Sequence, residues 1–275
     1  MRKLLVTDID KTLSRGETVA PEVCEACSRL RRGGWDIMVA TGRVLTTARP
    51  HILAVGSEMP AIVYDGARVM DVATAAPLFE TSMSPGLVLD VLEATWNAPV
   101  ELQVMGDEAA FCRVQDVTTR AFFSSADLPV QDALESPRAL EGIFRVIFFG
   151  QPEIVRDLSA ELSARFAGRA EVVLSGDRFL DVLPAGVSKG AALMRFLKGL
   201  PERPDILVAA GDHHNDLALF EAADVVAAPE DAAEEIVGRA DIIMPSVARH
   251  GFALLADYLL QGDVIGRPFK PVVLL

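Results

Sequence analysis

The chain has 275 residues, of which 51% are hydrophobic and 24% are charged, as in a globular protein with one large or two ordinary domains. Its formal charge of −13 repels phosphate backbones and anionic lipids, so neither nucleic acid nor a membrane is an expected partner. No apolar run approaches the roughly 20 residues of a membrane span, no signal peptide is evident, and three cysteines argue against a disulfide framework. We therefore expect a cytoplasmic protein, whose oligomeric state the sequence leaves open.

The first segment of the chain alternates predicted strands and helices. Its strands are expected at residues 4–7, 35–40 and 61–64, and its helices at 21–32 and from the loop at 41–43 to about residue 55. Asp65-Gly66 is a hairpin signal that leads from the third strand into residues 68–71.

The middle segment has a different pattern. Hairpins are predicted for residues 100–105 with 109–114 and for 172–175 with 179–183, a strand for 144–149, and helices for 85–95, 116–126 and 153–166. Hairpins with interspersed helices indicate an α+β unit with an antiparallel sheet.

The last segment returns to alternation, with strands at 206–210, 225–228 and 242–244 and helices at 189–200, 217–223, 232–239 and 252–260. Continuous apolar strands joined by helices indicate a parallel sheet covered on both faces. The predicted fold class is therefore α/β, a doubly wound parallel-sheet core formed by residues 1–82 and 185–275, with an inserted α+β domain at residues 83–184.

Two carboxylates, Asp8 and Asp10, lie where the first strand ends. In an open α/β sheet, ligands bind at this carboxyl end of the strands. Two acids one residue apart are costly to hold together unless a cation or a proton lies between them. The pattern indicates metal-assisted chemistry, with one Asp as nucleophile and the other as proton carrier or ligand, although Asp-x-Asp also occurs in polar turns.

A second acidic cluster, with Asp212 and Asp216, follows the strand at 206–210. If that strand neighbours the first one, four carboxylates converge, and an all-oxygen site of this kind suits Mg²⁺. We interpret His213 and His214, between these acids, as loop residues or substrate neighbours rather than as ligands.

Two further elements suit a phosphate group. Thr41-Gly42 offers a hydroxyl and a loop N–H at the end of the second strand, and Lys189 offers a charge near a helix start. The order around Lys189 is not that of a P-loop. Each feature also has an ordinary interpretation, as a helix cap or a solvated helix residue, so the inference depends on the clusters occurring together.

Together these clusters resemble the four motifs of the haloacid dehalogenase superfamily of phosphatases, with an insert typical of the Cof-type branch and its larger α/β cap. The motifs are Asp8-x-Asp10-x-Thr12, Thr41-Gly42-Arg43, Lys189, and Gly211-Asp212-x-x-Asn215-Asp216. Asp65-Gly66-Ala67 lies where that branch usually has Asn-Gly-Ala. The similarity spans nearly the whole chain and is weakest within the insert.

The resemblance implies a role for each motif residue. Asp8 would attack phosphorus and form an aspartyl phosphate, while Asp10 would act as acid and then as base. The phosphate would be held by Thr41, Gly42, Lys189 and Asn215, and Mg²⁺ by Asp8, Asp10 (through its carbonyl), Asp212 and Asp216. Arg43, Asp65 and Gly66 are candidate substrate contacts, and the insert would determine specificity.

The resemblance thus predicts a Mg²⁺-dependent phosphatase for a small phosphorylated metabolite such as a sugar phosphate. Two alternatives stay open: a phosphomutase or phosphotransferase that uses the same aspartyl phosphate, and a non-enzymatic phosphoacceptor. Lys11 departs from the glycine usual in cap-bearing members. Asp10-Lys11-Thr12 is similar to the phosphorylation motif of P-type ion pumps, but without membrane spans and with Asp8 nearer the strand end we assign Asp8 as nucleophile.

Overall fold

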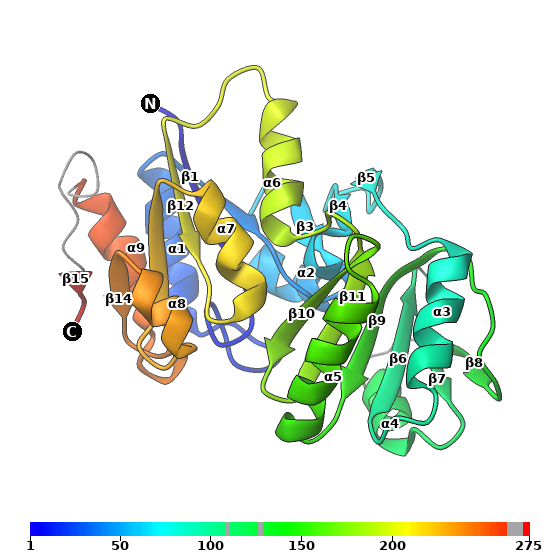
Figure 1. Ribbon diagram of the computed structural model, residues 1–275. Coiled ribbons are helices and arrows are strands. Elements are labelled where there is room, and N and C mark those ends of the chain that lie inside the picture. The colour runs from blue at the N-terminus through cyan, green and yellow to red at the C-terminus, as the bar shows by residue number, and fades with distance from the viewer. Residues whose placement is uncertain (108–109, 126–128, 263–271) are drawn as a thin grey trace. The chain divides into compact units, whose positions relative to one another are not determined.

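The computed structural model describes residues 1–107, 110–125, 129–262 and 272–275 (Figure 1). Within these residues the chain forms two compact units: a core unit, residues 1–79 with 188–275, and an inserted unit, residues 80–187. None of the described helices is both long and apolar enough to cross a membrane.

The core unit contains a parallel sheet in the order β15-β14-β13-β12-β1-β2. Its strands are β1 (Lys3–Thr7), β2 (Trp35–Val39), β12 (Ile206–Ala210), β13 (Val225–Pro229), β14 (Ile242–Met244) and β15 (Val272–Val273). β1 pairs with β12 on one side and β2 on the other, so that Thr7 is level with Ala210 and Val39. The loops that follow these three strands therefore leave the sheet side by side, which is the condition for the predicted site.

Helices cover both faces of this sheet, as Figure 1 shows. The helices are α1 (Pro21–Arg32), α2 (Leu45–Ala54), α6 (Lys189–Lys198), α7 (Leu217–Ala222), α8 (Glu234–Arg239) and α9 (Gly251–Leu260). Alternate strand residues, including Leu4 and Val6, share one apolar cluster with Leu193 of α6 and Phe220 of α7. α1 and α9 pack against each other. Since β12 and β13 are buried along their whole length, the predicted doubly wound parallel sheet is confirmed.

The chain after α2 forms a small three-stranded sheet of β3 (Ala61–Val63), β4 (Arg68–Met70) and β5 (Pro77–Glu80). Apart from Glu80, its residues belong to the core unit. β3 and β4 form the predicted antiparallel hairpin, joined by a short 3₁₀ turn at Tyr64–Gly66. A parallel bridge between Ala40 and Ile62 continues β2 toward β3. β5 was not predicted from the sequence.

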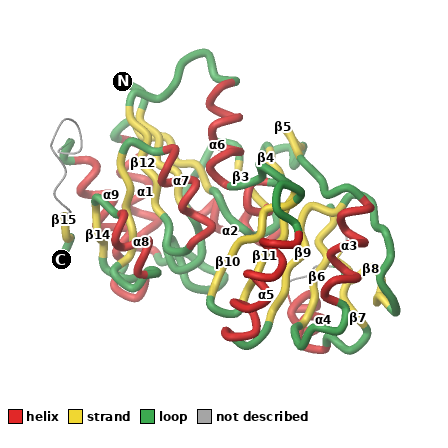
Figure 2. Tube along the Cα trace, in the orientation of Figure 1, coloured by secondary structure: helices red, strands yellow, loops and turns green. Residues whose placement is uncertain are grey.

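The inserted unit is an α+β fold with its own six-stranded sheet, in the order β10-β11-β9-β6-β7-β8. Its elements are α3 (Pro85–Thr95), β6 (Glu101–Gly106), β7 (Ala110–Arg113), α4 (Val117–Ser125), β8 (Val130–Leu134), β9 (Ile143–Phe149), α5 (Pro152–Arg165), β10 (Ala170–Gly176) and β11 (Phe179–Pro184). Figure 2 shows strands that follow one another in pairs in this part of the chain, whereas helices join the strands of the parallel core sheet. Val88 of α3, Leu162 of α5 and Phe148 of β9 lie in one buried cluster.

One expectation for the inserted unit is wrong in part, because its sheet is not wholly antiparallel. β8 falls in a polar stretch where no strand was predicted, and it pairs with β7 in parallel. The cause is α4, which connects these two strands and returns the chain to the same end of the sheet, as a parallel pair requires. Residues 109 and 126, at the ends of two predicted elements, lie outside the described residues.

Candidate active site

Asp8 and Lys189 meet at the carboxyl end of the central strand. Asp8 is the first residue after β1; its backbone N–H donates to the Ala210 carbonyl at 2.9 Å, and it is 5% exposed. Lys189 begins α6 and is 1% exposed. Its Nζ donates to Oδ1 of Asp8 at 2.8 Å and to Oδ1 of Asp216 at 2.7 Å. A helix start and a strand end, 181 residues apart, thus place an ammonium group directly against a buried carboxylate.

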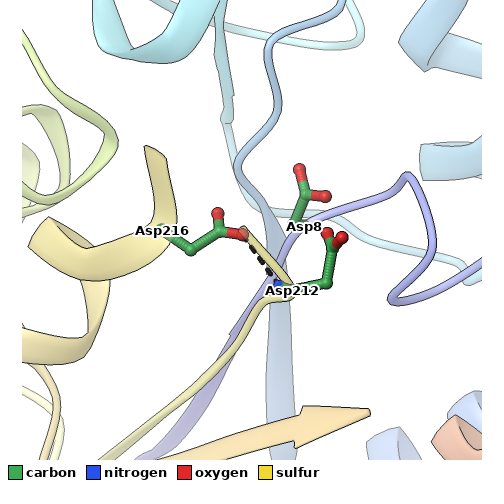
Figure 3. A group of neighbouring side chains, drawn as sticks. All are labelled: Asp8, Asp212 and Asp216. Carbon is green, nitrogen blue, oxygen red and sulfur yellow. Dashed lines mark hydrogen bonds between the residues drawn. The ribbon is translucent and has the colours of Figure 1, made fainter. Parts of the chain in front are cut away.

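Asp212 and Asp216 complete a cluster with Asp8, shown in Figure 3, in which one carboxylate oxygen of each acid lies within 4.8 Å of the others. Oδ2 of Asp216 accepts hydrogen bonds from the backbone N–H groups of Asp212 at 2.9 Å and His213 at 3.2 Å. A Cβ at Gly211 would lie 2.5 Å from Cβ of Asp216. Glycine is therefore needed at position 211 for the loop to fold over the Asp216 side chain.

Burial and mutual repulsion perturb the charges of these groups. Burial raises the pKa of Asp8 well above its ordinary value; Lys189 opposes the rise, and Asp216 and Asp212 add to it. The pKa of Asp212 is raised to about 7, chiefly by burial and to a smaller extent by repulsion from Asp216. Burial by itself would lower the pKa of Lys189, but the carboxylates of Asp216 and Asp8 raise it above its ordinary value. Lys189 is therefore an ammonium ion at neutral pH.

The donor set fits a divalent metal ion. Three buried carboxylates face one lysine, which leaves an excess of negative charge that a cation would offset. All the side-chain donors are oxygens, the ligand type that Mg²⁺ prefers. Among the sequence-predicted ligands, Asp8, Asp212 and Asp216 are brought together here.

The carboxylate of Asp10 does not join this cluster. It is held by Arg43, whose Nε donates to Oδ2 at 2.9 Å and whose Nη2 donates to Oδ1 at 2.7 Å, and the Asp10 side chain is 54% exposed. The chain leaves the strand direction after Asp8 and turns tightly, with Lys11 at a φ of 58° and its N–H bonded to the Ser14 carbonyl. The expected convergence of four carboxylates is thus met by three, because this turn and Arg43 direct the fourth away.

Arg43 itself is engaged with several neighbours. Besides Asp10, its guanidinium donates to Oε2 of Glu17 at 3.3 Å and to the Gly16 carbonyl at 3.1 Å. The Arg43 side chain is 15% exposed. The structure therefore shows this candidate substrate contact as a group that ties the loop after Asp10 to the loop after β2.

Thr41 and Gly42 form the loop after β2, as predicted. Thr41 is fully buried, its N–H donates to the Ile62 carbonyl at 2.9 Å, and its Oγ1 accepts from the Arg43 N–H at 3.1 Å. The last contact is a turn within the loop and not a helix cap, because α2 begins at Leu45 and its N-cap is Val44. Gly42 lies half-buried between these residues.

Asp65 and Asn215 are in contact with each other close to Lys189. Nδ2 of Asn215 donates to Oδ1 of Asp65 at 2.8 Å, and the same oxygen lies 3.9 Å from Nζ of Lys189. Asp65 is 2% exposed. Gly66 has a φ of +102°, and a Cβ there would lie 2.2 Å from the Ser188 carbonyl oxygen, so its lack of a side chain serves packing. Sequence reasoning placed Asp65 near the site but did not anticipate its contact with Asn215.

Residues of the loops after β1 and β12 surround Asp212. Oγ1 of Thr12 donates to Oδ1 of Asp212 at 3.5 Å, a contact that sequence reasoning did not assign. The positive charge of Lys11 lowers the pKa of Asp212 against the effect of burial. The Nδ1 atoms of His213 and His214 lie 3.4 Å apart. Neither histidine belongs to the acidic group found among the described residues.

The fold and the site together define an α/β enzyme with an acidic, lysine-containing centre at the carboxyl edge of a doubly wound sheet. The sequence profile of the haloacid dehalogenase-like hydrolases matches residues 5–255. The chain belongs to this family, as the four motifs indicated.

Several known proteins are similar to this chain. An HMP-PP phosphatase from Serratia proteamaculans is 27% identical over 220 residues, which cover 78% of this chain and 79% of the relative. A putative phosphatase from Haemophilus influenzae is 26% identical over 222 residues, covering 79% and 81%.

Two solved structures share the fold over nearly the whole chain. A haloacid dehalogenase-like hydrolase from Bacteroides thetaiotaomicron has a TM-score of 0.79 at 18% identity, covering 94% of this chain and all of the other. A sugar phosphatase of subclass IIB of the superfamily has a TM-score of 0.77 at 16% identity, covering 96% of this chain and all of the other.

Proposed function

We propose that this protein is a Mg²⁺-dependent phosphatase that hydrolyses a small phosphorylated metabolite through an aspartyl phosphate on Asp8. The observation that carries the proposal is the buried contact of 2.8 Å between Asp8 and Lys189, beside the carboxylates of Asp212 and Asp216. A phosphate monoester carries roughly −1.5 to −2 charges and repels a carboxylate nucleophile. Lys189 offsets that repulsion at the atom that must attack.

The residues divide the reaction between them. Lys189, Thr41, the loop N–H at Gly42 and Asn215 would hold the phosphoryl oxygens. A carboxylate oxygen of Asp8 would form a bond to phosphorus as the bond from phosphorus to the leaving oxygen breaks. When bound, Mg²⁺ held by Asp8, Asp212 and the Asp10 carbonyl, supported by Asp216, would supply positive charge that stabilises the transition state.

Asp10 would move the protons in both steps. It would give a proton to the leaving oxygen, and then take one from the water that attacks phosphorus, which releases phosphate and regenerates Asp8. In the structure the Asp10 carboxylate is bound to Arg43. Proton transfer therefore requires Asp10 to exchange this partner for the substrate during turnover.

We assign substrate recognition to the inserted domain, residues 83–184, and catalysis to the domain formed by residues 1–82 and 185–275. The relatives named above include an HMP-PP phosphatase and a sugar phosphatase, both of which act on small molecules according to their names. These names support a small phosphorylated metabolite, and we propose a sugar phosphate as the first class to test.

The direct test is phosphate release from a panel of sugar phosphates and HMP-PP, with Mg²⁺ and with EDTA. We expect release only with the metal, loss of at least about 10³-fold in Asp8→Asn, and an acid-stable phosphoenzyme in trapping experiments that Asp8→Asn abolishes. Asp36→Asn, an exposed acid on β2, is the matched control and should retain activity.

Three results would contradict the proposal. If metal-loaded protein hydrolysed none of the esters, the assigned reaction would be wrong. If Asp8→Asn kept full activity and still formed phosphoenzyme, while Asp10→Asn abolished both, the nucleophile would be Asp10 instead. Formation of an isomeric ester without net phosphate would identify a mutase or phosphotransferase that uses the same aspartyl phosphate.

A further inference from the structure

The turn at Tyr64–Gly66 has a left-handed backbone, which residues with side chains adopt uncommonly. Tyr64 and Asp65 have φ angles of 53° and 52°, and Gly66 has one of 102°. Two consecutive residues with side chains in the left-handed region are unfavourable because the Cβ crowds the following carbonyl. Such conformations persist only where the surroundings determine them, and they concentrate at functional sites.

Two neighbouring segments hold this turn. The N–H of Tyr64 donates to the Arg43 carbonyl and the N–H of Asp65 donates to the Thr41 carbonyl, both at 3.1 Å. On its other side, Gly66 packs so closely on the Ser188 backbone that a Cβ would come within 2.2 Å of it. The turn is therefore fixed between the Thr41 loop and the start of α6, and both of these carry proposed phosphate-binding groups.

The side chain of Asp65 extends from this turn to a third such group, Asn215. Its Oδ1 accepts from Nδ2 of Asn215 at 2.8 Å while Asp65 itself is almost fully buried. A carboxylate only accepts hydrogen bonds, so Asn215 must direct its NH₂ group toward Asp65, and this fixes which way the amide faces. A carboxylate also repels phosphate, which argues against direct contact between Asp65 and the phosphoryl group.

We propose that Asp65 is a positioning residue that orients the amide of Asn215 for the phosphoryl group. This inference rests on the proposed function, since it assigns Asn215 to phosphate binding. The left-handed turn sets the position of the Asp65 carboxylate, and the hydrogen bond from Asn215 to that carboxylate sets the orientation of the Asn215 amide. The second N–H and the oxygen of this amide then have fixed directions. Asp65 therefore acts on the substrate through Asn215, and not as the substrate contact that the sequence indicated.

The test removes the Asp65 carboxylate without disturbing the turn. Asp65→Gly suits this purpose, because glycine adopts a φ near 52° without strain. We expect kcat/KM for a phosphate ester to fall about ten- to hundredfold, and the inhibition constant of inorganic phosphate to rise by a similar factor, since a hydrogen bond to a charged group is lost. Asp65→Asn retains an acceptor and tolerates this backbone, so it should restore activity to within about threefold of the wild type.

A double-variant cycle with Asn215→Ala separates positioning from a general loss of structure. If Asp65 acts through Asn215, then Asp65→Gly with Asn215→Ala should be no more than about threefold below Asn215→Ala alone. Asp71→Gly, in the exposed turn after β4 of the same hairpin, is the matched control and should leave both constants unchanged.

The inference fails if Asp65→Gly binds phosphate and hydrolyses the ester as the wild type does. It also fails if the loss of kcat/KM in the double variant equals the product of the losses in Asp65→Gly and Asn215→Ala. It also fails if Asp65→Asn is as defective as Asp65→Gly. A wild-type protein that hydrolyses no ester would instead refute the proposed function. In that case phosphate binding by the wild type and Asp65→Gly, measured by calorimetry, still decides whether Asp65 orients an anion site.

Discussion

Without divalent cations, the folded protein should lose stability as the pH rises from about 4 to about 7. The pKa of Asp212 is raised from 3.8 to about 7, and the pKa of Asp8 is raised in the same direction, both chiefly by burial. A carboxyl whose pKa is higher in the folded chain favours folding while it is protonated. That contribution is complete below the unfolded pKa of 3.8 and is lost as the pH rises through the folded value.

The size of the effect follows from the shift of Asp212. A difference of about three pKa units corresponds to about 4 kcal/mol, at about 1.4 kcal/mol per unit. Asp8 adds to this loss, while Lys189 reduces it by stabilising the ionised form of Asp8. Since domains are stable by only about 5–15 kcal/mol, the loss is a large part of the total.

Urea denaturation at pH 5 and pH 8, in EDTA and in Mg²⁺, measures this effect. In EDTA we expect the free energy of unfolding to be several kcal/mol smaller at pH 8. Mg²⁺ should restore most of the loss at pH 8 and little at pH 5, because its ligands must be ionised. Asp212→Asn should reduce both the pH dependence and the response to Mg²⁺, whereas Asp36→Asn should not. A flat profile in EDTA, or equal stabilisation by Mg²⁺ at both pH values, would refute the electrostatic reasoning.

Three substitutions test packing and buried charge. Lys189→Met leaves the buried carboxylates of Asp8 and Asp216 without their ammonium partner, and should lower the free energy of unfolding at pH 7, measured in urea, by about 3–5 kcal/mol. Gly190→Ala places a Cβ 1.9 Å from the Ala218 carbonyl oxygen, so α6 must shift from α7 at a cost of about 1–3 kcal/mol, measured by thermal unfolding. Arg113→Met removes the cation that contacts Asp116 within the inserted unit, and should increase hydrogen exchange in β6 and β7 more than in the core sheet.

These three predictions have clear controls. Gly238→Ala, in α8 with open space around a new Cβ, should be neutral or slightly stabilising. Equal effects at Gly190 and Gly238 would contradict the packing argument. A Lys189→Met variant as stable as the wild type would mean that this lysine is not the main counter-charge of the acids. Uniform exchange in Arg113→Met would show that the two units do not open separately.

Much of the fold was predictable because most helices and strands are indicated by residues within the element itself. The bounds of α1, α3 and β14 match the prediction to the residue, since proline at the helix starts and apolar periodicity are local signals. β5, β8 and β15 were missed. All three lie at sheet edges, where pairing with one neighbouring strand, and not the local sequence, makes each of them a strand.

The sequence predicted which residues lie near the site better than it predicted the directions of their side chains. Acids after apolar strands, together with the parallel order of the sheet, suffice to bring Asp8 and Asp212 to one edge. The direction of a side chain, by contrast, depends on backbone angles and on partners far along the chain. The left-handed turn at Lys11 and the position of Arg43 direct Asp10 away from Asp8, and the left-handed Asp65 directs its carboxylate toward Asn215.

Asp8 and Asp10 were expected to need a cation between them, and the structure meets that need in another way. Each carboxylate has its own counter-ion: Lys189 for Asp8 inside the site, and Arg43 for Asp10 at its edge. Repulsion between the two acids is thereby reduced in the resting protein. The same arrangement holds both Asp10 oxygens on Arg43, so Asp10 must turn from Arg43 to face the leaving oxygen. Exchange of Arg43 for the leaving oxygen is therefore a required step of the proposed reaction, and it links Asp10 to the loop that Arg43 holds.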